Sequence, residues 1–153
     1  MPATANIYDA LRESHQLQRS LCRKLLRAGS GDRRREIYRQ LRTELAAHAA
    51  AEERFLYAPI LMDDMGLDSS RHALSEHHEI DECIEELGKA DEGGRSWLAR
   101  AKKLSEEVHH HLKEEEKKFF QVSGKILTDT QKTRLASRYL KDYERMKKVL
   151  ENA

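Results

Sequence analysis

Apolar residues recur along this chain mostly at steps of three and four, which is the spacing of an amphipathic helix. Stretches that combine glycine with Asp, Ser or Thr interrupt this pattern, as helix ends require, and they fall at 28–32, 62–70, 89–96 and 123–130. No alternating strand pattern competes with the helical one. The sequence therefore predicts five helices, near 6–28, 33–61, 70–89, 96–124 and 129–151.

The starts of these helices are predicted from residues that cap helix N-termini. The expected N-caps are Asp32, Ser69 or Ser70, Ser96 and Thr128. Thr128 is followed by Gln131 at the spacing of a capping box, in which each residue satisfies a backbone N–H of the other.

The apolar stripes of the first four helices are those of an antiparallel bundle. At 153 residues the chain is expected to form one domain, residues 1–153. We predict an all-α fold: an up-down-up-down four-helix bundle over 6–125 with an additional C-terminal helix over 129–151. That last helix either covers one side of the bundle or offers a dimer surface, so a monomer or a weak homodimer is expected.

Each of the four bundle stripes carries one histidine near its middle, and two stripes carry a glutamate four residues later. These residues are His15, His48, Glu52, His77, His111 and Glu115. Counting along each stripe distinguishes them from their neighbours. His111 lies on the apolar face, whereas His109 and His110 do not, and His77 points inward, whereas His78 does not.

The four histidines also lie at matching heights. In an up-down bundle with a rise of ~1.5 Å per residue, His15 and His48 are roughly 20 Å from the same end, and His77 and His111 agree within about a turn. Burying imidazoles and carboxylates together costs several kcal/mol for each unpaired charge. A metal ion removes this cost, because it binds neutral imidazole and ionised carboxylate. The layer therefore predicts a metal site.

The donor set favours non-haem iron or manganese, since calcium and magnesium prefer oxygen ligands and a single tetrahedral zinc needs only four ligands. Six ligands on four helices fit two metal ions better than one. If Glu52 and Glu115 each bridge, and an oxo or hydroxo bridge is added, about two of twelve octahedral positions stay open. Open positions take exogenous ligands such as dioxygen, peroxide, nitric oxide or water. Zinc or manganese is expected to compete in a recombinant host.

Composition excludes several other classes of function. The formal net charge is +1, from 28 basic and 27 acidic residues, which favours neither nucleic acid nor a membrane surface as partner. Cys22 and Cys83 are isolated and fit a reducing compartment. The N-terminal residues lack the pattern of a signal peptide, and no segment approaches the ~18 apolar residues of a membrane helix. We expect a cytoplasmic protein.

The spacing of the six residues, with the tails "EERFLY" and "EEKKFF", resembles the hemerythrin HHE cation-binding domain over roughly residues 7–125. The resemblance implies a left-handed four-helix bundle around a carboxylate-bridged di-iron centre. It assigns His15, His48, His77 and His111 as terminal ligands and Glu52 and Glu115 as bridges. Ferritin-like di-iron proteins use Glu-x-x-His pairs instead, and these are not placed on the stripes.

Two departures from the invertebrate oxygen carriers of that family indicate the bacterial type. Asp81 stands where they have a fifth histidine, and His111-x3-Glu115 replaces their His-x4-Asp. Asp81 is open to three roles: a seventh ligand, a base that hydrogen-bonds a ligand, or a partner of a surface cation. Tyr8 and Tyr57 are within reach of the centre, with packing as the expected role of both.

Three functions remain open at this point. The first is a non-haem di-iron protein that binds a small oxidant: dioxygen, peroxide or nitric oxide. The second is a di-iron enzyme with catalase-like or peroxidase-like activity, because replacing a histidine by Asp81 leaves one iron less saturated. The third is iron storage or delivery in a stress response.

Overall fold

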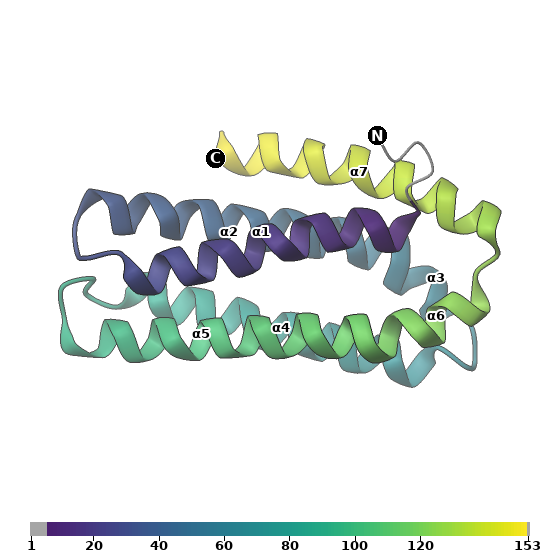
Figure 1. Ribbon diagram of the computed structural model, residues 1–153, viewed down its shortest axis with the longest axis horizontal. Coiled ribbons are helices and arrows are strands. Elements are labelled where there is room, and N and C mark those ends of the chain that lie inside the picture. Colours follow the sequence, from purple (N-terminus) through teal and green to yellow (C-terminus); the bar gives the residue numbers. More distant parts are fainter. Residues whose placement is uncertain (1–5, 153) are drawn as a thin grey trace.

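The computed structural model describes residues 6–152, and every regular element in that part of the chain is helical. The four long bundle helices are α1 (Ile7–Arg27), α2 (Asp32–Glu52), α4 (Leu67–Lys89) and α5 (Arg95–Glu114). They run up and down in turn, and a fifth helix, α7 (Asp129–Glu151), lies along α1 and α2 (Figure 1). The expected all-α bundle with an additional C-terminal helix is confirmed.

The helices α2 and α5 each continue through a π-helical turn into a short further helix. On one side these are η1 (Glu53–Tyr57) and α3 (Ala58–Leu61), and on the other η2 (Glu115–Phe119) and α6 (Phe120–Ile126). The two continuous rods agree with the expected helices over 33–61 and 96–124. A π-helical turn widens the helix locally and often marks a functional site, and here each one begins immediately at or after a candidate bridging glutamate.

Most of the expected N-caps are wrong. Only Thr128 caps its helix, forming the expected capping box with Gln131 at the start of α7. The other three predicted starts follow glycines without a side-chain cap, so Asp32, Ser69, Ser70 and Ser96 lie inside their helices. The turns before these helices end on Gly31, Gly66 and Gly94, and Gly31 has a φ of 121°, which glycine adopts without strain. The start of α1 is capped by Asn6 with Asp9, a capping box that the sequence pattern did not reveal.

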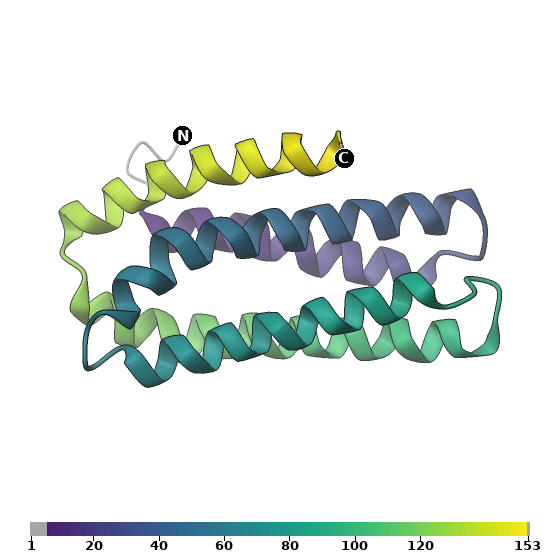
Figure 2. The same ribbon diagram turned by 180° about the vertical axis from the view of Figure 1, so that it is seen from behind.

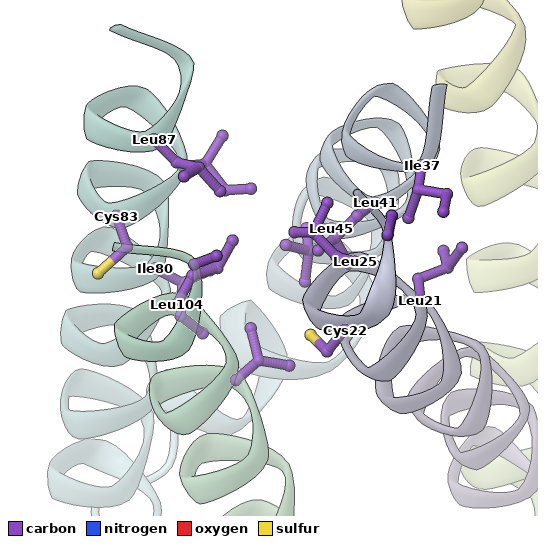
Figure 3. Packing of buried hydrophobic residues seen from close by; sticks show 14 of the residues in the cluster. Leu21, Cys22, Leu25, Ile37, Leu41, Leu45, Ile80, Cys83, Leu87 and Leu104 are labelled. Carbon is purple, nitrogen blue, oxygen red and sulfur yellow. The ribbon is translucent and has the colours of Figure 1, made fainter. Parts of the chain in front are cut away.

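The apolar core is divided into two clusters. The first lies toward the α1–α2 and α4–α5 connections and includes Leu25, Leu41, Ile84 and Leu104 (Figure 3). The second lies toward the other end of the bundle and includes Ile7, Leu11, Leu56, Ile60, Phe119 and Tyr139. Along α1, α2 and α4 the predicted histidine falls between the positions of the two clusters. The candidate ligands therefore occupy a polar layer that is sealed by apolar side chains above and below.

The fifth helix closes one side of that layer. Leu135, Ala136 and Tyr139 of α7 are buried, and Figure 2, the view from behind, shows the helix lying beside part of α2. The role of covering one side of the bundle is thus observed, whereas a dimer surface on α7 stays a prediction.

Cys22 and Cys83 are buried and unbonded to each other, and burial raises the pKa of Cys22 to about 12. Within residues 6–152 no helix is both long enough and apolar enough to cross a membrane.

Candidate metal centre

The structure brings the six predicted residues together from four helices into two overlapping groups. One contains His15 and His48 and the other His77 and His111, and both groups include Glu52 and Glu115. In each group the ligand atoms lie within 4.8 Å of one another. All six side chains are buried, and none is more than 5% exposed. Each group could hold a metal ion, and the two groups share both carboxylates.

Each of the two glutamates lies close to one histidine from each group. Glu52 Oε1 is 3.1 Å from Nε2 of His48 and 3.2 Å from Nε2 of His77. Glu115 Oε1 is 3.1 Å from Nε2 of His15, and its other oxygen is 3.8 Å from Nε2 of His111. Both carboxylates therefore lie between the two groups and are placed to bridge.

Most of the atoms that point into this layer lack hydrogen-bond partners. Among residues 6–152, seven buried side-chain atoms have none, and six of them belong to this layer. They are Nε2 of His15, His48 and His111, both oxygens of Glu52 and Oε1 of Glu115. A buried unsatisfied polar atom costs about 1–3 kcal/mol, so bound cations would remove a substantial penalty. Imidazole nitrogen and carboxylate oxygen together suit iron or manganese.

The opposite ring nitrogen of every histidine is satisfied. Nδ1 of His15 donates to Glu116 at 2.6 Å, and Nδ1 of His77 donates to Glu53 at 2.7 Å. Nδ1 of His111 donates to Glu76 at 2.8 Å. The fourth bond, at 2.8 Å, joins Nδ1 of His48 to the hydroxyl oxygen of Tyr139 on α7. A proton held on Nδ1 leaves the lone pair of Nε2 free to bind a metal ion. Metal-binding histidines are usually oriented in this way.

Two pairs of adjacent glutamates, Glu52-Glu53 and Glu115-Glu116, form doublets whose members have different roles. The first member of each doublet, Glu52 or Glu115, points into the layer, whereas the second accepts the Nδ1 bond of a histidine on another helix. The π-helical turns begin at this point and continue beyond it. Burial alone would raise the pKa of Glu116, but hydrogen bonds from His15 and Arg19 lower it to about 2.

Tyr57 was expected to serve mainly in packing, yet its hydroxyl donates a hydrogen bond to Glu115 Oε2. The same hydroxyl is 3.3 Å from Nε2 of His77. Burial, together with the charges of Glu115 and Glu52, raises the pKa of Tyr57 well above its ordinary value, so the phenol keeps its proton. Tyr8 instead bonds to Ser123 at 2.7 Å and packs against Phe120, away from the ligand atoms.

The choices between neighbouring histidines agree with the structure. His77 and His111 are buried, while the side chains of His78 and His110 are 76% and 64% exposed. Asp81 lies on the exposed surface of α4 and belongs to neither group of ligand atoms.

The sequence profile of the hemerythrin HHE cation-binding domain matches residues 6–122, most of the chain. The chain belongs to this family. The fold agrees with a crystal structure of a hemerythrin HHE cation-binding domain-containing protein from Mycobacterium kansasii, with a TM-score of 0.85. The two are 21% identical, and the match covers 95% of this chain and 89% of that one. Because that alignment includes α7, the additional helix is part of the shared fold.

A longer relative contains a similar stretch. A protein from Nostoc sp. named DNA nickase is 25% identical over 134 residues. The match covers 88% of this chain and 38% of that protein.

Three features of this hemerythrin-type centre were not predicted from the sequence. The first is the role of Glu53 and Glu116 as hydrogen-bond acceptors for His77 and His15. Their position directly after the candidate bridging glutamates could have indicated it. Glu76 adjoins His77 but binds His111 on the neighbouring helix. Tyr139 sits on the apolar stripe of α7, where nothing in the local pattern separates a hydrogen-bonding tyrosine from a packing one.

Replacing Tyr139 by Phe removes the hydroxyl that orients His48. We expect Tyr139→Phe to weaken binding of the ion held by His15 and His48 by about 10- to 100-fold, the usual cost of losing a partner of a metal ligand. Competition with a chromophoric chelator measures this. The matched control is Tyr143→Phe, because Tyr143 stacks on Tyr139 but bonds to Glu44. Equal affinities for the two variants would contradict the assignment.

The metal-free protein should lose stability as pH rises from neutral to alkaline. Burial would lower the pKa values of the inward histidines, but hydrogen bonds to glutamates raise that of His15 to about 9 and that of His77 to about 10. Unfolded histidine titrates near ~6.5, so this stabilisation is complete below ~6.5 and is lost as pH rises through 9 to 10.

Thermal unfolding followed by circular dichroism tests this expectation. The melting temperature of the metal-free chain should fall between pH 7 and 10, whereas the metal-loaded chain should change much less, because cations replace the two protons. Parallel pH profiles for the two forms would contradict this account of the histidines.

Proposed function

We propose that this hemerythrin-family protein is a non-haem di-iron protein that binds a small oxidant such as dioxygen, peroxide or nitric oxide. The observation that carries the proposal is the pair of ligand groups sharing Glu52 and Glu115, with their unpartnered atoms facing one another. Two bound iron ions would supply redox chemistry and open coordination positions.

The protein's own residues set the conditions for such binding. The four histidines are fixed by their Nδ1 bonds, so the donor atoms are organised before a metal arrives. The apolar clusters on both sides exclude water from the layer. One cavity of about 230 Å³ between α4 and α5 is lined by His111, Glu115 and Phe119. This volume suits a small molecule. The cavity borders the ligand group of His77 and His111, because His111 and Glu115 line it.

A specific observation also favours a second candidate function, the decomposition of peroxide. Tyr57 holds a phenolic proton between Glu115 and His77 within the layer. A buried hydroxyl that keeps its proton beside the open side of the centre can donate a hydrogen bond to a bound peroxide and stabilise the charge that develops as the peroxide is cleaved. Iron storage or delivery stays the third alternative, and the rate at which a chelator removes the iron distinguishes it.

Optical spectroscopy of the iron-loaded, reduced protein tests the first function. We expect about two iron ions per chain and a new visible band on exposure to dioxygen or nitric oxide that reverses when the gas is removed. Loss of about one metal equivalent and a lower melting temperature are expected for Glu52→Ala, because both groups lose a shared ligand. Glu82→Ala, on the exposed face of α4, is the control. Rapid loss of the iron to a chelator would favour delivery, and failure to bind iron would overturn the proposal.

Peroxide consumption tests the second function. If Tyr57 assists, Tyr57→Phe should lower the rate of gas evolution by about 10²-fold or more while retaining both iron ions and the dioxygen-dependent band. Tyr8→Phe serves as the control, since Tyr8 bonds to Ser123 outside the centre. Equal rates for the two variants would remove the structural reason for the enzymatic alternative.

A further inference from the structure

A second set of histidines and glutamates lies outside the di-iron layer, on the facing surfaces of α4 and α5. His72 and Glu76 are on α4, and His110 and Glu114 are on α5. Both pairs repeat the His-x3-Glu spacing of the inner ligands, which places the two side chains of each pair on one helix face. Unlike the inner set, the two histidines are largely exposed, with side chains 58% and 64% accessible.

The four side chains converge across the two helices. Nε2 of His72 is 2.6 Å from Glu114 and 3.4 Å from Glu76. Nε2 of His110 is 3.1 Å from Glu114 and 3.5 Å from Glu76. Donor atoms around a tetrahedral ion with bonds of ~2.0–2.1 Å lie about 3.3 Å apart. His72, Glu76 and Glu114 offer ligand atoms that lie within 4.8 Å of one another. His110 reaches the same two carboxylates, so it can join this group of three as a fourth ligand after a rotation of its exposed imidazole.

This outer set is joined to the inner centre through Glu76. One oxygen of Glu76 accepts the Nδ1 bond of His111, while its other oxygen faces His72 and His110. The cavity of about 230 Å³ is lined by His72, Glu76 and Glu114 and also by His111 and Glu115. The outer set and two residues of the inner layer therefore border the same cavity, and the atoms His111 Nε2 and Glu115 Oε1 are buried behind it without a hydrogen-bond partner.

The charge of the cavity favours a cation over an anion. Its lining includes three carboxylates, Asp68, Glu76 and Glu114, outside the inner layer, against the one cation of Lys118. A mouth with an excess of negative charge raises the local concentration of divalent ions. Neutral imidazoles beside two carboxylates select transition ions over calcium or magnesium.

We propose that His72, Glu76, His110 and Glu114 form a third, mononuclear site for a divalent transition ion, and that ions pass through it into the inner centre. The outer ion site is argued from its own distances and residues. The passage of ions from it to the inner centre rests on the proposed di-iron function. Glu76 links the two sites, because one of its oxygens would bind the outer ion while the other orients the inner ligand His111.

Zinc binding measured by equilibrium dialysis and elemental analysis tests the outer site. The wild-type chain should hold three Zn²⁺ ions, and the double variant His72→Asn/His110→Asn should hold two with an unchanged fold by circular dichroism. The control is His78→Asn, because His78 and Glu82 form the same i, i+4 pair on α4, exposed and 3.4 Å apart. This control should retain three ions.

The results separate this proposal from the proposed function. Two ions in both the wild type and the double variant, or three in both, would overturn the outer site and leave the inner centre intact. A wild-type chain that held only one ion, lost in the double variant, would support the outer site and contradict the dinuclear centre.

The role in loading is tested by the rate at which Fe²⁺ becomes resistant to a strong chelator under anoxic conditions. At low Fe²⁺ concentration the double variant should fill its inner centre about tenfold more slowly than the wild type, and reach the same final content of two ions. The His78→Asn control should load at the wild-type rate. Equal rates for the double variant and the wild type would overturn passage through the outer site.

Discussion

The structure depends on one electrostatic constraint: four imidazoles and two carboxylates share a buried layer in the middle of a helical bundle. Without cations between them, six of their inward atoms lack hydrogen-bond partners, and each such atom is costly in a dry interior. The same layer divides the apolar core into two clusters, which hold the helices in register on either side of it. Protons on His15 and His77 satisfy part of the constraint in the metal-free chain, and metal ions satisfy it fully.

The two ligand groups are similar inside but differ in their surroundings. His15 and His77 are held alike, each by the second glutamate of a doublet on another helix. His48, however, is held by Tyr139 of α7, whereas His111 is held by Glu76 of α4. The additional helix thus closes one side of the centre, and the cavity between α4 and α5 opens the other. This asymmetry gives the pair of sites one covered face and one approachable face, and it places the outer histidines on the approachable side.

The six inward residues could be predicted because helical geometry converts sequence spacing into direction and height. A histidine on an apolar stripe points inward, and a glutamate four residues later shares its face. The hydrogen-bond partners could not be predicted in the same way, since Tyr139 meets His48 across 91 residues and depends on how α7 crosses α2. The π-helical turns were not predicted either. Each adds one residue to a turn and so shifts the buried face beyond its glutamate by one position, to Leu56 and Ile60 after Glu52 and to Phe119 and Ser123 after Glu115. The starts of α2, α4 and α5 were predicted wrongly for a local reason: each of these helices begins directly after a glycine, ahead of or at the polar residue expected to cap it.

The central claim is that two metal ions lie between the two glutamates of the buried layer. Anomalous X-ray diffraction from crystals of iron-loaded protein, collected on both sides of the iron absorption edge, tests it most directly. The account predicts two iron peaks about 3.5–4 Å apart, one beside His15 and His48 and one beside His77 and His111, with Glu52 and Glu115 spanning both. A single peak, or iron found only at the protein surface with the six inward side chains bonded to one another, would contradict it.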